Sequence, residues 1–236
     1  MLDQSARTAQ QTVDDWLYEE TDGTVQSGPF AGIWLSRAQA WQTGALSPML
    51  LGCHEEELHP FIEEQIVRLE KMENPKIVNV GCAEGYYAVG LAKRLPKATV
   101  WAVDILDEAL EITAECAAAN GVNVVIKDNL DNAFSSPDLV VMDCEGHEVS
   151  YLDSEVFPAL RQATIIVEIH NLRDFPRADE IIIGRFHETH TIENVFEGSR
   201  NPNNFGILQN TVSALRWMCV CENRPCLMNY FVMRPR

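Results

Sequence analysis

The sequence predicts an α/β fold with a doubly wound, mostly parallel sheet, and three observations lead to it. Five short apolar runs lie between residues 76 and 170, and each has the length of a strand. The runs are continuously apolar, which is typical of strands that are covered on both faces. Helical patterns lie between most of these runs, as in parallel βαβ units with right-handed crossovers. We therefore expect a Rossmann-like domain with helices on both faces of its sheet.

Residues 1–75 are expected to form a helical and irregular extension that contributes to the substrate side of the domain. An amphipathic pattern predicts a helix over residues 1–20, and a segment rich in Gly, Ser, Pro and aromatic residues follows over 21–53. An apolar stripe at three- and four-residue spacings predicts a second helix over 54–72, with Pro60 in its first turn.

The domain itself is expected to span residues 76–236, with seven strands. They are predicted at IVNV, TVWAV, VNVVI, DLVVM, TIIVEI, residues 188–196 and LMNYFVM. Helices are predicted at YYAVGLAKRL, DEALEITAECAAAN, VSYLDSEVFPALRQA and residues 174–187. Residues 197–226 form an irregular insertion before the last strand, with a helical stretch near 207–217. We expect this insertion above the carboxyl ends of the strands, where ligands bind in such sheets.

The amino-acid composition disfavours some classes of binding partner. The chain has 236 residues and a formal net charge of −17, which disfavours nucleic acid and anionic membrane surfaces as partners. No run reaches the roughly 18 apolar residues of a membrane helix, and the first residues lack the apolar core of a signal peptide. The seven cysteines show no zinc-site spacing. We expect a cytoplasmic protein with reduced thiols and a small-molecule substrate, and a homodimer is compatible with this composition.

The turn GCAEG, which follows the run IVNV, predicts a nucleoside cofactor. Gly81 permits a tight turn at positive φ, and Gly85 permits close approach of a ligand where the next helix begins. Asp104 ends the following strand, 23 residues after Gly81. A carboxylate at that place can accept two hydrogen bonds from a ribose diol.

Glu84 favours one class of cofactor. Dinucleotides prefer G-x-G-x-x-G around a pyrophosphate, but here the middle glycine is absent and the Glu84 carboxylate would repel that anion. S-adenosylmethionine carries no phosphate and has two cationic groups, so we predict S-adenosylmethionine. Alternatively, Glu84 is an idle loop charge that points to solvent.

A second segment, IKDNLDN, offers contacts to the adenine. Asp128 and Asn129 follow the third strand and are placed to reach an adenine amino group. The alternative for these residue types is a helix N-cap or a turn.

Acids and histidines gather after the fourth and fifth strands. Asp143, Glu145 and His147 follow DLVVM, whereas Glu168 and His170 end TIIVEI. Strand alternation places Glu168 and His170 on the same side, and neighbouring strands would bring all five residues into one catalytic site. We predict His170 as the general base, with His147 as the second candidate, because histidine titrates near neutral pH.

The same side chains suit other roles. Carboxylates and imidazoles are ligands for magnesium, manganese or iron, and a bound metal could hold a diol substrate and lower its pKa. Without such chemistry, His170 would be a capping or core histidine, and Glu145 and Glu148 would be charges at a helix N-terminus.

Three segments in this order, NVGCAEGYYAVGLA, DLVVMDCEGHEVSYLD and IIVEIH, resemble class I S-adenosylmethionine-dependent methyltransferases. More narrowly they resemble the FkbM-like group, which carries D-x-E-G-x-E after its fourth strand. The resemblance covers roughly residues 28–170. It implies a cofactor pocket, in which we include the residues Asn79, Gly81, Cys82, Glu84, Gly85, Tyr86, Asp104, Ile105 and Asp143.

The resemblance also implies the reaction. It implies methyl transfer from S-adenosylmethionine to a hydroxyl of a small molecule, such as a sugar or a natural-product intermediate. Three alternatives stay open: N-methylation of a small amine, a nicotinamide-dependent oxidoreductase on the same fold, and a non-catalytic member of the family.

Overall fold

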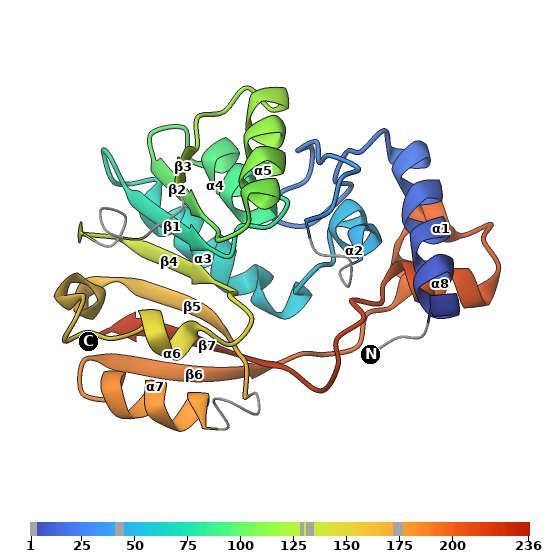
Figure 1. The fold of residues 1–236 in the computed structure, drawn as a ribbon. Coiled ribbons are helices and arrows are strands. Elements are labelled where there is room, and N and C mark those ends of the chain that lie inside the picture. Colours follow the sequence, from blue (N-terminus) through green and yellow to red (C-terminus); the bar gives the residue numbers. More distant parts are fainter. Residues whose placement is uncertain (1–3, 41–44, 128–129, 131–134, 172–176) are drawn as a thin grey trace.

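The computed structural model describes residues 4–40, 45–127, 130, 135–171 and 177–236, and it contains a seven-stranded sheet in the order β3-β2-β1-β4-β5-β7-β6 (Figure 1). The strands are β1 (Lys76–Val80), β2 (Thr99–Val103), β3 (Val125–Lys127), β4 (Leu139–Met142), β5 (Thr164–Ile169), β6 (His190–Phe196) and β7 (Asn229–Pro235). The first five are parallel, and β7 runs antiparallel to both of its neighbours. The predicted fold class is therefore confirmed.

Helices cover both faces of the sheet. They are α1 (Gln4–Thr21), α2 (Leu46–Leu51), α3 (His59–Leu69), α4 (Tyr86–Arg94), α5 (Asp107–Ala119), α6 (Glu148–Tyr151), α7 (Ala178–Phe186) and α8 (Ser213–Cys219), with 3-10 turns at η1 (Glu56–Leu58), η3 (Pro158–Gln162), η4 (Pro202–Asn204) and η5 (Gly206–Leu208). Figure 1 shows α4 and α5 on one side and α6 and α7 on the other. Alternate strand residues enter the two cores: Ile77 packs with the α3–α5 side and Val78 with the α6–α7 side.

Three predicted helices differ from the structure, and one of them, predicted near 207–217, is α8, which spans only Ser213–Cys219. The helix predicted at VSYLDSEVFPALRQA ends at Tyr151, because the Asp153 carboxylate accepts the N–H groups of Glu155 and Val156 and forms a turn. Pro158 then begins the separate turn η3. The helix predicted over 54–72 is shorter, since α3 spans only His59–Leu69 after the turn η1, although Pro60 lies in its first turn as predicted.

The extension and the insertion meet beside the carboxyl edge of the sheet. Helices α1, α2 and α8 contact one another there (Figure 1). Helix α2, which was not predicted, is joined to α1 by buried hydrogen bonds: the Asp14 carboxylate accepts the Ser47 N–H at 2.9 Å, and Gln10 donates to both residues. Within the described residues, no helix has both the length and the apolar character needed to cross a membrane.

Candidate functional site

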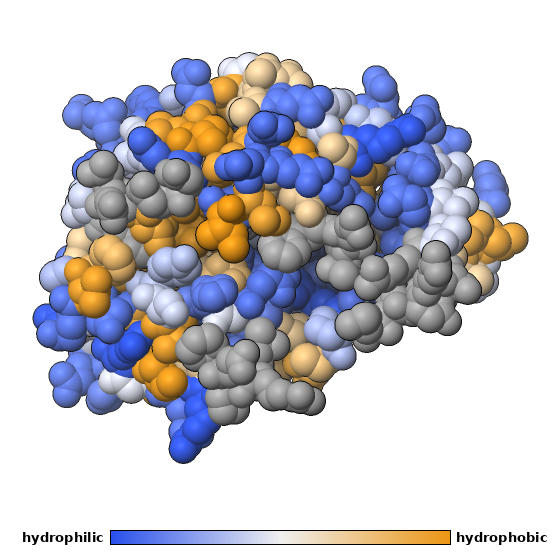
Figure 2. All heavy atoms as spheres, viewed as in Figure 1, coloured by the Kyte–Doolittle hydropathy of each residue, from blue (hydrophilic) through white to orange (hydrophobic). Residues whose placement is uncertain are grey.

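A cavity of about 1070 Å³ lies at the carboxyl ends of β1, β4 and β5. Its described lining also includes residues of α1, of the segment from α2 to η1, and of the insertion. Figure 2 shows hydrophilic atoms in a hollow near the middle of this face. Ligand pockets usually enclose roughly 300–1,000 Å³. The cavity therefore has room for a nucleoside cofactor together with a small acceptor.

The glycine turn after β1 is shaped by contacts within the protein. Gly81 has a φ of 73°, and a Cβ on it would lie 1.5 Å from the carbonyl oxygen of Asp143. Gly85 has a φ of 82°, and its Cβ would lie 3.1 Å from the Thr113 side chain on α5. Helix α5 thus approaches Gly85 closely through Thr113.

Asp104 braces this turn. Its carboxylate is buried and accepts the N–H of Ala83 at 3.1 Å and the N–H of Leu106 at 3.0 Å. Ile105 is largely exposed. Neither Asp104, Ile105 nor Gly85 is among the described residues that line the cavity.

The other described residues of the predicted cofactor pocket do line the cavity: Asn79, Gly81, Cys82, Glu84, Tyr86 and Asp143. Two of them, Asn79 through Oδ1 and Tyr86 through its hydroxyl, are buried without a hydrogen-bond partner in the described part of the chain. An unpaired buried polar group costs about 1–3 kcal/mol, so a ligand that pairs with them would be stabilised.

Glu84 is engaged within the protein. Its Oε1 accepts the N–H of Ala40 at 3.0 Å, which ties the segment before the cavity to the glycine turn. Asp128 and Asn129, the predicted adenine contacts, lie outside the described residues.

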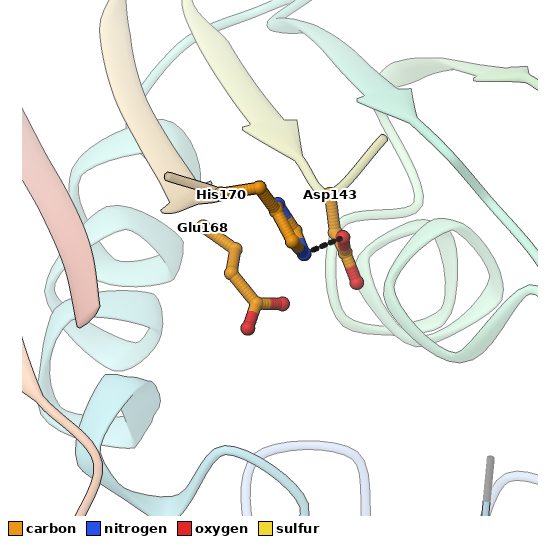
Figure 3. Close-up of side chains that lie close together, drawn as sticks. All are labelled: Asp143, Glu168 and His170. Atoms are coloured by element: carbon orange, nitrogen blue, oxygen red, sulfur yellow. Dashed lines mark ion pairs between the residues drawn. The ribbon is translucent and has the colours of Figure 1, made fainter. Parts of the chain in front are cut away.

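At the end of β5, His170 is held by a buried acid. Its Nδ1 lies 2.8 Å from Oε1 of Glu148, which is fully buried on α6. Because a carboxylate accepts, Nδ1 carries the hydrogen, and in the neutral ring Nε2 is left with its lone pair. Nε2 lies 3.8 Å from Oδ1 of Asp143 (Figure 3) and 3.6 Å from Oε2 of Glu145.

The ends of β4 and β5 bring most of the predicted catalytic residues together. Asp143, Glu168 and His170 each offer a nitrogen or oxygen atom within 4.8 Å of those of the other two (Figure 3). Glu145 also lines the cavity. His147, the second candidate base, is exposed at the N-cap of α6 and is not among the described residues that line the cavity.

The ionisation of these groups is strongly perturbed. Burial, and the nearby charges of Asp143 and Glu55, raise the pKa of Glu168 to about 11. Burial likewise raises the pKa of Asp143 to about 6. Burial alone would lower the pKa of His170, but the hydrogen bond with Glu148 and the surrounding carboxylates raise it above its usual value. At this site the carboxyl groups of Asp143, Glu145 and Glu148 face His170, and that of Glu168 faces Arg224.

A network of ion pairs that was not predicted lines the cavity on the side of the insertion. Arg224 contacts Glu168, lies 3.0 Å from Oε1 of Glu55 and lies 2.8 Å from Oε2 of Glu222. Arg200 binds the other oxygen of Glu222 at 2.6 Å. No periodic pattern in the insertion marks these residues, so only the fold reveals them.

Comparisons with known proteins agree with this fold. Residues 77–165 match the family described as methyltransferase domain. A release factor glutamine methyltransferase from Flavobacterium psychrophilum is 36% identical over 69 residues, which are 29% of this chain and 24% of that protein. A ribosomal protein L11 methyltransferase from Thermotoga neapolitana is 35% identical over 88 residues, which are 36% of this chain and 33% of that protein. The chain therefore spans only about a quarter to a third of the length of these relatives.

Two solved structures share the fold. A proposed O-methyltransferase from Klebsiella pneumoniae has a TM-score of 0.51 at 12% identity and covers 74% of this chain and 78% of its own. An rRNA methylase from Streptococcus thermophilus has a TM-score of 0.50 at 13% identity, with coverage of 76% and 96%. Over residues 77–165 the chain is thus similar to a methyltransferase domain, and its fold is the one that these two structures share.

Proposed function

We propose that the protein transfers a methyl group from S-adenosylmethionine to a hydroxyl of a small molecule. The observation that carries this proposal is the buried pair of His170 and Glu148, which leaves Nε2 facing the cavity at the ends of β4 and β5. A hydroxyl must lose its proton during the reaction, and a placed base typically accelerates such a step by about 10²–10⁴-fold. An amine acceptor depends less on a base.

The residues fit S-adenosylmethionine as the cofactor. Unpaired polar atoms of Asn79 and Tyr86 lie in the described lining beside the glycine turn. The Lys and Arg side chains in the described lining are Arg200 and Arg224, and both are paired with carboxylates. This charge distribution suits a cationic cofactor better than a diphosphate. When bound, S-adenosylmethionine supplies the methyl group, and its carbon–sulfur bond breaks as the carbon–oxygen bond to the acceptor forms.

The chain's own residues then have distinct roles. The walls of the cavity hold the acceptor oxygen in line, and orientation of this kind can supply roughly 7–11 kcal/mol. Nε2 of His170 is the first candidate to receive the proton of the hydroxyl. Glu148 fixes the ring and stabilises the imidazolium that would result, at 2.8 Å from Nδ1.

We also propose membership of the FkbM-like group, because the residues of its motif have clear roles. Glu148, the last acid of D-x-E-G-x-E, is the partner of His170 and also accepts the N–H of Gly146 at 3.0 Å. The first acid, Asp143, lines the cavity beside the same histidine.

The second candidate is methylation of a nitrogen in a protein. The names of the two curated relatives, which act on a release factor glutamine and on ribosomal protein L11, favour it. Those relatives match only over part of their length, so their substrates do not decide the acceptor.

Two experiments test the proposal. In isothermal titration calorimetry with the full chain, S-adenosylhomocysteine should bind and NADH should not, and the reverse result would overturn the proposal. Methyl-labelled S-adenosylmethionine is then offered with catechols and monosaccharides, and separately with glutamine- and lysine-containing peptides. Label only on the peptides would favour the second candidate.

His170→Ala should lower turnover on a hydroxyl acceptor by about 10²–10⁴-fold, because the candidate base is lost, and should leave the affinity for S-adenosylhomocysteine nearly unchanged. The matched control is His187→Ala, which removes an exposed histidine outside the described lining of the cavity. Parental turnover in His170→Ala would show that this ring takes no part in the reaction.

A further inference from the structure

We propose that Asp143, Glu168 and His170 together bind a divalent metal ion of the manganese or iron class. Metal binding at this place does not depend on the proposed function. A catalytic role for the ion does, because it rests on the proposed hydroxyl acceptor. The three donor atoms lie within 4.8 Å of one another at the adjoining ends of β4 and β5 (Figure 3). Two sheet neighbours thus supply two carboxylate oxygens and one imidazole nitrogen to a single point.

The separation of Asp143 and His170 suits a single ion. A small divalent ion holds oxygen and nitrogen ligands at about 2.0–2.2 Å, so two ligands of one ion lie at most about 4.4 Å apart. Nε2 of His170 and Oδ1 of Asp143 are 3.8 Å apart, which is inside this limit. That separation is too long for a hydrogen bond.

The hydrogen bonding of His170 is that of a metal ligand. A metal-binding histidine almost always donates its other N–H to a carboxylate or a carbonyl group. Nδ1 of His170 does so to the buried Glu148, at 2.8 Å. His190, a buried histidine elsewhere in the sheet, has both nitrogens in hydrogen bonds: Nδ1 with the Thr189 hydroxyl at 2.9 Å and Nε2 with the Ala163 carbonyl at 3.0 Å.

A separate observation also indicates a ligand at this place. Tyr230 lies directly opposite Glu168 in the pairing of β5 with β7, and it lines the same cavity. Its side chain is fully buried, yet its hydroxyl has no hydrogen-bond partner among the described residues. A water molecule or an acceptor oxygen bound to the ion would give this hydroxyl a partner.

The balance of acidic and basic side chains at this site favours the binding of a cation. Arg224 is the nearest arginine to Glu168, but it is shared with Glu55 and Glu222. Asp143, Glu145 and Glu148 all face the one ring of His170, so the carboxyl groups at this site outnumber the positive groups that pair with them in the described part of the chain. A divalent ion would supply further positive charge.

The donor set selects the class of ion. Carboxylate oxygens suit magnesium and manganese, whereas imidazole suits iron and zinc, so a mixed set favours manganese or iron. An acceptor hydroxyl bound to the ion would have a lowered pKa. With the ion bound, Nε2 of His170 would be a ligand and could not also be the base. The hydroxyl proton would then pass to Glu145 instead, whose Oε2 lies 3.6 Å from Nε2.

The test is a titration of the metal-stripped full chain with Mn²⁺. Binding is measured as the loss of the electron paramagnetic resonance signal of free Mn²⁺. One ion should bind per chain. His170→Ala and Glu168→Gln should each weaken binding by at least about tenfold, and Glu148→Gln, which only positions the histidine, should weaken it by about 10–100-fold. Glu188→Gln removes an exposed acid outside the described lining and should bind as the parent does.

The outcomes separate this proposal from the proposed function. If S-adenosylhomocysteine binds but Mn²⁺ does not, or if Mn²⁺ binds equally well to His170→Ala, the metal site is wrong and methyl transfer is unaffected. If Mn²⁺ binds at the site but S-adenosylhomocysteine does not bind, the proposed function fails and the metal site stands. Circular dichroism checks the folding of each variant. If His170→Ala does not fold, His170→Gln takes its place.

Discussion

At the scale of single residues, Gly81 and Asp104 fix the backbone of the glycine turn beside the cavity. Gly81 lets the turn after β1 lie against the carbonyl oxygen of Asp143, and Asp104 holds the N–H groups of Ala83 and Leu106. The cofactor side of the cavity and the cluster around His170 are therefore joined through the backbone. A change at Gly81 should disturb both.

Gly81→Ala should destabilise the protein more than Gly121→Ala. Both glycines have positive φ, but a Cβ at Gly121 meets no atom within 4 Å, whereas at Gly81 it meets the Asp143 carbonyl oxygen. The conformational cost is about 1–2 kcal/mol at either position, and the clash adds about 1–3 kcal/mol at Gly81. Urea unfolding measures both changes, and equal losses would contradict the close contact.

Asp104→Ala should weaken S-adenosylhomocysteine binding at least about tenfold, because the charged hydrogen bonds that brace the glycine turn beside the cavity are lost. Isothermal titration calorimetry measures the affinity. The control is Asp107→Ala, which removes an exposed acid in the first turn of α5. If the affinity of Asp104→Ala matches that of the parent, this brace does not shape the cofactor side of the cavity.

The sequence predicts part of the candidate site for a simple reason. Asp143, Glu168 and His170 follow adjacent parallel strands, and adjacent strand ends meet in any such sheet. Glu55 and Arg224 could not be predicted in the same way, because they come from irregular segments whose place depends on tertiary packing.

At the scale of elements, the insertion is attached to the domain through buried ions as well as through the packing of α8 on α1 and α2. Arg224, whose side chain is only 14% exposed, joins the insertion to Glu168 on β5 and to Glu55 beside η1. A buried ion pair adds little net stability compared with apolar packing, but removal of one partner leaves uncompensated charge. The insertion should therefore depend on this side chain.

Arg224→Met should lower the free energy of unfolding by about 3–5 kcal/mol, because buried carboxylates lose their partner. Urea unfolding measures this loss. Arg177→Met is the control, since Arg177 pairs with Glu180 in the open, at 69% and 57% side-chain exposure, and such a pair is worth at most about 1 kcal/mol. Similar losses in the two variants would show that the network does not hold the insertion.

The elements that were predicted correctly are those with strong local patterns. Strands β1, β2, β4 and β5 are continuous apolar runs, so their positions follow from burial on both faces. The prediction was wrong after β4 because it followed apolar periodicity through Asp153 and Pro158, which stop the helix. Helix α2 was missed because six residues that end at Gly52 are too few to show a period.

At the scale of the whole molecule, stability should depend on pH through buried histidines as well as acids. Burial lowers the pKa of His190 below its usual 6.5. The Nε2–H of His190 donates to the Ala163 carbonyl, so Nδ1 must stay unprotonated to accept from Thr189. As the pH falls below about 6.5, the unfolded chain binds the proton first, and stability is lost down to the folded pKa.

His190→Gln should reduce this loss of stability on acidification. Glutamine can donate and accept in the same places but does not titrate between pH 4 and 7. The free energy of unfolding, measured by urea at several pH values, should fall less steeply below about pH 6.5 in the variant than in the parent. The acids with raised pKa values act in the opposite direction, and comparison of the two proteins removes their contribution. Parallel curves would contradict this expectation.

The order of the last strands has a consequence for synthesis on the ribosome. Within the described residues β6 pairs only with β7, and β7 lies between β5 and β6 although it is made after both. While the segment between them is translated, the nascent chain carries two strand edges with free backbone groups, which are the usual starting points of aggregation. Chaperone binding during translation should therefore concentrate on β5 and β6, and end when β7 emerges and fills the gap.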